Sequence, residues 1–214
     1  MGSSLGRLLA EIRACRVCVE EPDRKPLPHA PRPVLRVSTT ARLAVVGQAP
    51  GTRVHASGVP FSDPSGERLR AWMGVTDNEF YDVRRVAIIP MGFCYPGQDS
   101  KGADLPPRPE CARRWRSRLF DKLPEIELIL LVGGYAQRWH LAASAGSNVT
   151  ETVRAWREIR DRPGPCRYLP LPHPSWRNNG WLKAHPWFEA ELLPSLRQEV
   201  RHLLGPAASA DQTN

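Results

Sequence analysis

Apolar residues along this chain gather in four short continuous runs, separated by segments whose apolar positions recur every three or four residues. The runs are LAVVG (43–47), RVAIIP (85–90), IELILLVGG (126–134) and RYLPLP (167–172). Continuous apolar runs of this length predict strands that are buried on both faces, as in a parallel sheet. The prolines of the fourth run restrict it to a sheet edge or to a short strand.

Helical periodicity surrounds these runs. It predicts helices over 5–14, 65–74, 110–120, 135–141 and 186–205, with Gly74 ending the second and Pro194 breaking the last near its start. Segments rich in Pro, Gly or charge are interpreted as irregular, namely 20–40, 48–64 and 91–109. Alternating strands and helices predict an α/β fold, a single domain with a central, mainly parallel four-stranded sheet flanked by helices. We expect it to span 1–205, including an arm at 10–40, with 206–214 a disordered tail.

Three loops leave the ends of predicted strands. They are GQAPG (47–51), VGG (132–134) and HPS (173–175). Ligands of parallel sheets bind at the carboxyl ends of the strands. The sequence contains neither GxGxxG nor a P-loop, the glycine-rich signatures of nucleotide binding. We therefore expect the three loops to carry the chemistry of the chain.

The composition narrows the choice of partner. The chain of 214 residues carries a formal net charge of +8, which favours polyanions, above all nucleic acid. Hydrophobic residues make up 41% of the chain, but no apolar run reaches the roughly 18 residues that span a bilayer. The first residues also lack the apolar core of a signal peptide. We expect a cytoplasmic protein that acts as a monomer and has no membrane partner.

The five cysteines have an informative spacing. An odd count without an export signal argues against a disulfide framework. Cys15 and Cys18 form a CxxC pair, and Cys94 and Cys111 follow at a distance. If the fold brings these four together, they form a four-thiolate site for a [4Fe–4S] cluster or zinc. The alternative is four unrelated cysteines buried as small hydrophobes, which is our expectation for Cys166.

Taken together, these motifs resemble family 4 of the uracil-DNA glycosylases. That family has an N-terminal CxxC, a third Cys after the second strand and a fourth at the next helix. It also has a G-x-x-P-G loop, a Gly-x-Pro-Phe segment, a Gly after the third strand and a late His-Pro motif. The counterparts here occur in the same order between about residue 10 and about residue 200: Cys15, Cys18, Gly47–Gly51, Gly58–Phe61, Cys94, Cys111, Gly133 and His173–Ser175. The resemblance implies a structural [4Fe–4S] cluster, in preference to zinc. It also implies hydrolysis of the bond between uracil and deoxyribose in DNA, which leaves an abasic site.

Two side chains suit the bond-breaking step. Cleavage of the N-glycosidic bond creates a cation-like sugar and a uracil anion. His173 suits donation of a hydrogen bond to uracil O2 as negative charge grows there, and Asp63 suits water positioning or stabilisation of the sugar cation. Asp63–Gly66 resembles the D-x-S-G of family 5, whose Asp is catalytic, so the chain is a hybrid of the two families. The structural alternatives are a loop-ordering His173 and a plain helix N-cap at Asp63 or Ser65.

The base needs a stacking partner and polar contacts. Phe61 suits stacking unless it is a core residue, and Gln48 suits contact with the base unless it is a solvated loop amide. Family 4 reads the uracil edge with an Asn on the second strand, but 88–94 (IIPMGFC) contains none. We therefore expect a looser site that admits 5-substituted uracils or deaminated purines. The residues assigned to base binding are Gly47, Gln48, Ala49, Phe61 and Asn178.

The remaining candidates contact DNA. Trp176 or Arg177 suits a wedge that fills the gap left by a flipped base, while Ser65, Gly133 and Ser175 suit contacts to the flanking backbone. The rival hypothesis is a non-catalytic module that binds uracil-containing DNA or nucleic acid in general. The carboxylate at position 63 argues against it, because a mere binder has no need of a negative charge facing an anionic backbone.

Overall fold

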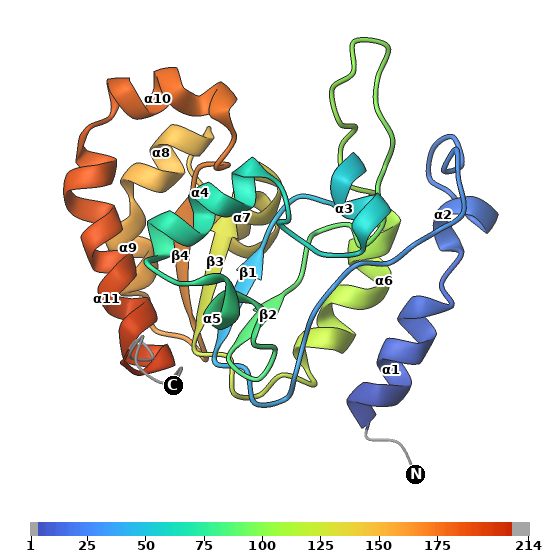
Figure 1. Cartoon of the computed structure of the whole chain (residues 1–214), viewed down its shortest axis with the longest axis horizontal. Helices are drawn as coiled ribbons and strands as arrows, with labels where there is room; N and C mark the ends of the chain where they lie inside the picture. Colours follow the sequence, from blue (N-terminus) through green and yellow to red (C-terminus); the bar gives the residue numbers. More distant parts are fainter. Residues whose placement is uncertain (1–3, 207–214) are drawn as a thin grey trace, which may run out of the picture.

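The centre of the fold is a sheet of four strands, all of them parallel (Figure 1). The computed structural model describes residues 4–206. The strands are β1 (Leu43–Val46), β2 (Val86–Ile88), β3 (Leu128–Val132) and β4 (Arg167–Leu171), in the order β2-β1-β3-β4. The predicted α/β fold is confirmed, and the proline-containing β4 lies at an edge of the sheet, the first of the two alternatives that its prolines allowed.

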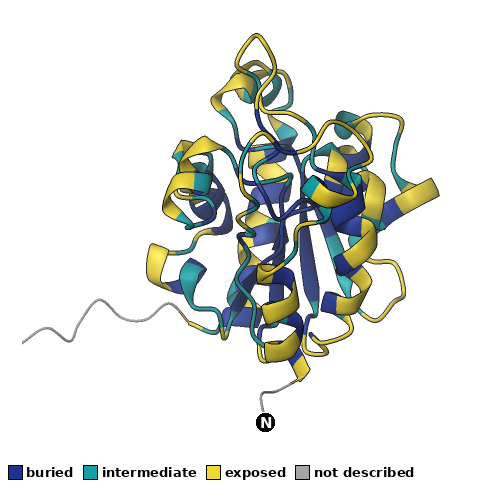
Figure 2. Ribbon diagram, turned by 90° about the vertical axis from the view of Figure 1, so that its right-hand side faces the viewer, coloured by how far each residue is buried: buried dark blue, intermediate teal, exposed yellow. Residues whose placement is uncertain are grey.

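Alternate residues of the strands enter two separate hydrophobic cores. In β1, Ala44 and Val46 join one cluster, whereas Leu43 and Val45 join the other. Every residue of β1, β2 and β3 is buried, so the strands form the buried centre of Figure 2. This double burial explains why the strands are continuous apolar runs rather than alternating patterns.

Two groups of helices cover the two faces of the sheet. Helices α1 (Ser4–Arg13) and α6 (Pro109–Phe120) pack in the cluster of Ala44, and α4 (Pro64–Met73) and α11 (Leu193–Leu204) pack in that of Leu43. The remaining elements are α2 (Val17–Glu20), α3 (Thr52–Ser57), α5 (Asp77–Tyr81), α7 (Gly134–Leu141), η1 (Ala142–Ser144), α8 (Val149–Arg154), α9 (Trp156–Arg160), η2 (Trp176–Asn178), α10 (Asn179–Ala184) and η3 (Phe188–Leu192).

Two expectations about local structure are wrong. The segment 48–64 is not all loop, because α3 forms within it and ends at Gly58, whose φ of 74° suits glycine. Pro194 does not break the C-terminal helix. It lies in the first turn of α11, directly after the π-helical η3. A proline in a first turn costs little, because its missing N–H has no helical acceptor there.

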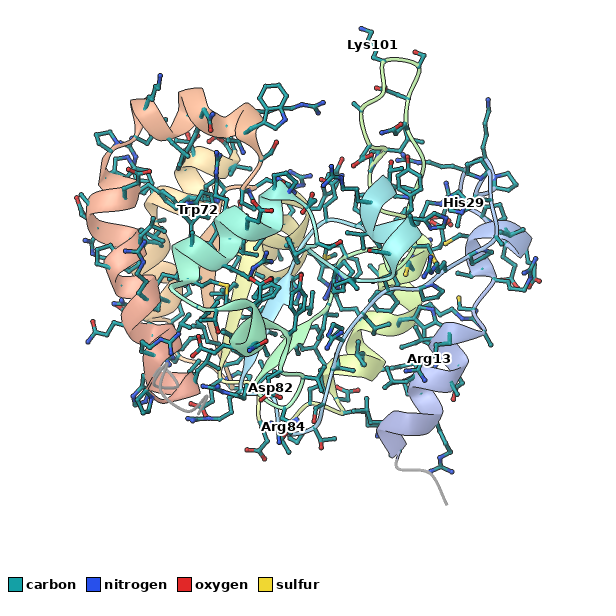
Figure 3. The ribbon with its side chains drawn as sticks, in the orientation of Figure 1. Arg13, His29, Trp72, Asp82, Arg84 and Lys101 are labelled. Carbon is teal, nitrogen blue, oxygen red and sulfur yellow. The ribbon has the colours of Figure 1, made fainter. Side chains whose placement is uncertain are left out.

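The carboxyl ends of the strands lie at the upper edge in Figure 1, where two projections rise. One is α10 with η2, which follows β4. The other lies within 91–109, which is irregular as predicted apart from an antiparallel bridge between Gln98 and Asp104. We call residues 97–105 the hairpin, and Lys101 marks its tip in Figure 3.

The boundaries at 1 and 205 stay predictions, and residues 207–214 of the expected tail lie outside the described residues. Among the helices of residues 4–206, none is long and apolar enough to cross a membrane.

Candidate active site

The three loops singled out from the sequence meet at the carboxyl edge of the sheet. GQAPG follows β1, Gly133 follows β3 and HPS follows β4, and these strands are neighbours. Gly133 has a φ of 84°, and its N–H donates to the carbonyl of Leu171. A Cβ at Gly133 would lie 3.7 Å from the Cβ of His173. The positive φ explains why glycine occupies this position, whereas a contact of 3.7 Å would by itself admit a side chain.

Phe61 lies directly against the GQAPG loop. A Cβ on Gly47 would lie 3.0 Å from Cζ of the Phe61 ring, so only glycine lets the ring approach this closely. Phe61 has a φ of 55°, which is uncommon for a residue other than glycine. Its carbonyl accepts hydrogen bonds from Arg70 Nη1 at 3.0 Å and from the Tyr81 hydroxyl at 3.1 Å. These donors hold Phe61 in a strained conformation, a feature that clusters at functional sites.

Asp63 is the N-cap of α4. Its Oδ1 accepts a hydrogen bond from the N–H of Gly66 at 3.1 Å. Gly66 cannot carry a side chain, because a Cβ there would lie 1.8 Å from the Phe61 carbonyl oxygen. Asp63 is therefore a helix N-cap, as the structural alternative predicted. The cap engages only one of its two carboxylate oxygens. Within residues 4–206, Oδ2 of Asp63 accepts no hydrogen bond.

His173 is a half-buried imidazole that follows β4. Burial lowers its pKa, while the carboxylates of Asp63 and, to a smaller extent, Asp104 act in the opposite direction. Because the pKa of His173 is lowered overall, its ring is neutral near pH 7. A neutral imidazole has one N–H group and donates one hydrogen bond. The Asn178 amide, which we assigned to the base, donates to the carbonyl of His173 at 2.7 Å and so fixes the loop that carries the ring.

The rest of the HPS loop is tied to α4 and carries an exposed aromatic ring. Arg68 donates to the carbonyl of Ser175 at 3.1 Å, and the Ser175 hydroxyl accepts from the N–H of Arg177 at 3.2 Å. Trp176 is 69% exposed, the most exposed large hydrophobic side chain described. Ser65 lies half-buried in the first turn of α4. Exposed aromatics at the edge of a site are typical of nucleic-acid contacts.

Gln48 and its neighbours contact the hairpin as well as Phe61. The Gln48 amide lies 3.5 Å from the carbonyl oxygen of Leu105, and the backbone of Gln48 and Gly47 pairs with residues 91–92. Ala49 lies between Gln48 and the buried Pro50. The glycine-rich loop is therefore held between the two chain segments that follow β2 and precede α4.

The four cysteines of the predicted cluster line a single cavity. Cys15 follows α1, Cys18 lies in α2, Cys94 follows β2 and Cys111 lies in α6. Cys15 accepts a hydrogen bond from the Trp115 indole at 3.2 Å, and Cys111 accepts one from the Phe93 N–H at 3.4 Å. Cys166 does not line this cavity. No three His, Cys, Asp or Glu side chains within residues 4–206 are close enough together to hold one metal ion.

A buried cation, Arg116, lies close to one of these sulfurs, that of Cys111. Arg116 is 3% exposed and donates to the carbonyls of Ile89 at 3.3 Å and Pro90 at 3.0 Å. Burial lowers the pKa of its guanidinium to about 10, and Cys111 acts in the opposite direction. Among residues 4–206, Arg116 has no carboxylate partner. Burial also raises the pKa of Cys18 to about 11, so these thiols ionise only when a cationic group compensates their charge.

Several site residues were not found from the sequence. Arg70 and Tyr81 fix the strained Phe61 from α4 and α5, and no local pattern marks them. Gly66 belongs to the DPSG segment, but the sequence does not show that its lack of a side chain makes room for the Phe61 carbonyl. Asp104 belongs to the hairpin, and it joins the site only because the base of the hairpin contacts the GQAPG loop at Gly51.

The site loops fall within the segment that a family comparison covers. The model of the uracil DNA glycosylase superfamily matches residues 36–197. This match includes β1 to β4, the GQAPG and HPS loops, Asp63 and the hairpin, and it begins after the CxxC pair. A match over most of the chain, on a parallel sheet whose carboxyl edge gathers these loops, shows that the protein belongs to the uracil DNA glycosylase superfamily.

Proposed function

We propose that this protein is a monofunctional DNA glycosylase that, as a monomer, hydrolyses the N-glycosidic bond of uracil in DNA and leaves an abasic site. One observation carries the proposal. Asp63 caps α4 and His173 follows β4, at the edge of the sheet where the site loops meet, and the negative charge of Asp63 partly offsets the lowering of the His173 pKa by burial. A carboxylate and a neutral imidazole near one another match the two charges that this reaction creates, a sugar cation and a base anion.

The base is taken out of the helix and stacked on Phe61. Enzymes that act on a base extrude it into a site that stacks and hydrogen-bonds it. The ring of Phe61 is fixed by its contact with Gly47 and by the two donors on its carbonyl. A stacking surface that is already in place loses little conformational entropy when the base arrives. The backbone around Gln48 and Ala49 then contacts the base edge.

His173 and Asp63 act on opposite ends of the breaking bond. The neutral imidazole donates a hydrogen bond to uracil O2, where negative charge grows. Asp63 uses one oxygen to cap α4 and keeps the other for the attacking water or the sugar cation. The cap fixes the orientation of the carboxylate, so the reactive oxygen is positioned before the substrate binds.

DNA contacts surround this centre. The net charge of +8 attracts the phosphate backbone. Ser65 lies in the first turn of α4, Gly133 follows β3 and Ser175 precedes η2, and in this proposal their hydroxyl and N–H groups contact phosphates flanking the lesion. Trp176, stacked within 5.8 Å of the Arg177 guanidinium, enters the duplex in place of the flipped nucleotide.

The base range is broader than uracil in this proposal. The segment after β2 offers no Asn, and the carbonyls of Ile89 and Pro90 are occupied by Arg116. The amide of Asn178 is engaged with the carbonyl of His173. Since no free side-chain amide is dedicated to the uracil edge at these positions, 5-substituted uracils and deaminated purines are accepted as well.

A structural [4Fe–4S] cluster, as in family 4, completes the proposal. Its support is the cavity shared by the four sulfurs, the N–H donors to Cys15 and Cys111, and the unpaired cation of Arg116. Zinc, which four thiolates can also bind, is the alternative occupant of this site. When bound to these cysteines, the cluster supplies a cross-link between the N-terminal arm and α6, and no reaction step uses it.

The test compares wild type, Asp63→Asn and His173→Ala on oligonucleotides that contain uracil, 5-substituted uracils or deaminated purines. Wild type is expected to give strand breaks at uracil only after alkali, because a monofunctional enzyme leaves an intact abasic strand. Each substitution is expected to lower the single-turnover rate on the order of 100- to 1000-fold, with DNA affinity retained. DNA binding without alkali-labile product from wild type would instead identify a non-catalytic module.

The cluster has its own readout. Protein purified without oxygen is expected to be brown, with broad absorbance near 400 nm and bound iron, as thiolate-ligated clusters show. A colourless protein that contains one zinc would contradict this part of the proposal and leave the glycosylase assignment intact.

A further inference from the structure

We propose that Asp104, on the hairpin, is a second carboxylate of the active site, which stabilises the positive charge on the sugar as the base departs. The inference rests on the proposed function. It concerns a segment between the third and fourth cysteines in which the sequence shows no motif.

The hairpin is an ordered element rather than a loose loop. Gly97 has a φ of 94°, and the N–H of Leu105 donates to its carbonyl at 2.9 Å. The Asp99 carboxylate accepts from the N–H groups of Lys101 at 2.8 Å and Ala103 at 2.9 Å, which closes the turn. The backbone that carries residue 104 is therefore fixed, while Lys101 points away at the tip (Figure 3).

The carboxylate of Asp104 lies against the GQAPG loop. A Cβ on Gly51 would lie 3.3 Å from Asp104 Oδ2, so the absence of a side chain at Gly51 leaves room for this oxygen. The other oxygen, Oδ1, accepts from the Gln98 amide at 3.3 Å. The Gln48 amide, 3.5 Å from the Leu105 carbonyl oxygen, links the hairpin to the same loop. Asp104 thus belongs to the edge of the sheet where the base and sugar bind.

Charge is the reason to assign it a role. Asp104 is exposed, and within residues 4–206 it forms no ion pair. Near DNA phosphates an unpaired carboxylate weakens binding, against the attraction that the net charge of +8 provides. A cation that forms only during the reaction would offset that cost. Beside this contact with the GQAPG loop, the charge of Asp104, like that of Asp63, partly offsets the lowering of the His173 pKa by burial.

The reaction then has a consistent separation of charge. The electron pair of the glycosidic bond leaves with the base, beside neutral His173. Water forms the new bond to the sugar carbon, and the proton that it loses ends on the departing base. Asp104 forms no bond and takes no proton. Its negative charge adds to that of Asp63 on the sugar side, where positive charge develops in the transition state.

The test uses Asp104→Asn, which keeps the shape and removes the charge, and Asp121→Asn, which makes the same charge change at the exposed end of α6. For Asp104→Asn we expect DNA affinity to stay equal or rise and the single-turnover rate on uracil-containing DNA to fall roughly 10- to 100-fold. Asp121→Asn is expected to keep the wild-type rate. A purely electrostatic surface role predicts no fall in rate for either variant.

The outcomes separate this inference from the proposed function. Wild-type excision together with a full rate in Asp104→Asn overturns the role of Asp104 alone, whereas a wild type that excises no base overturns both. A second readout needs no substrate. The pKa of His173, followed by NMR, is expected to be lower in Asp104→Asn than in wild type, because Asp104 raises it. An unchanged His173 titration would overturn the inference as well.

Discussion

The two faces of the central sheet are packed by different means. On the α4 and α11 face, large apolar side chains pack against one another, such as Trp72 and Phe188 with ring centroids 4.9 Å apart. On the α1 and α6 face, the buried cluster also contains the thiols of Cys18, Cys94 and Cys111. The first face is complete with its own side chains, whereas α6 on the second face also buries the guanidinium of Arg116, a charge that is costly without a partner.

The two faces support different parts of the candidate active site. The apolar face holds α4 in place, and α4 in turn carries Asp63 and the donor that fixes Phe61. The cysteine face holds the chain on either side of the hairpin, because Cys94 precedes it and Cys111 follows it. If the second face needs a bound group, removal of that group disturbs the hairpin before it disturbs α4.

The largest expected effect is on the cysteine face. Cys111→Ser removes one of the four proposed ligands, and we expect loss of bound iron and a fall of about 4 kcal/mol or more in the free energy of unfolding. Urea unfolding without oxygen, together with an iron assay, measures both. The matched control is Cys166→Ser, a half-buried cysteine outside the cavity, which should keep its iron. Equal losses in the two variants would show that burial of a thiol, and not ligation, stabilises this face.

A smaller loss is expected on the apolar face. Leu196 is fully buried in α11, and Leu196→Ala should cost about 3 kcal/mol through lost burial and the cavity left behind. The cost should be the same for iron-loaded and iron-free protein, because no ligand residue belongs to this cluster. The measurement is urea unfolding of both forms. A cost that depends on iron would mean that the two faces are coupled and that the comparison fails.

The long elements on both faces followed from the sequence, because burial on both sides produces continuous apolar strands and helices of three turns or so. The short helices α3, α5, α8 and α9 did not, since so few residues show no periodicity and tertiary contacts stabilise them. Pro194 was misjudged for a related reason: a π-helical turn before it lets the chain remain helical.

The site was predictable where chemistry lies in a local motif. GQAPG, HPS and the DPSG segment each follow or precede a recognisable element, so their meeting could be predicted from a parallel sheet. The contribution of Arg70 and Tyr81 could not, because it depends on where the Phe61 carbonyl points. Asp104 was hidden for the same reason, since the fold of the hairpin alone brings it to Gly51.

The smallest expected effect tests whether the buried Arg116 serves the proposed cluster. In iron-free protein the thiols are neutral, and replacing an unpaired buried cation by an apolar side chain is often neutral or stabilising. Arg116→Met should then change the free energy of unfolding little, because the loss of its hydrogen bonds to Ile89 and Pro90 offsets that gain. In iron-loaded protein the same guanidinium faces thiolates, so the substitution should cost about 1–2 kcal/mol more. Urea unfolding of both forms measures the difference, and an equal change in the two would mean that Arg116 serves only to hold the end of β2.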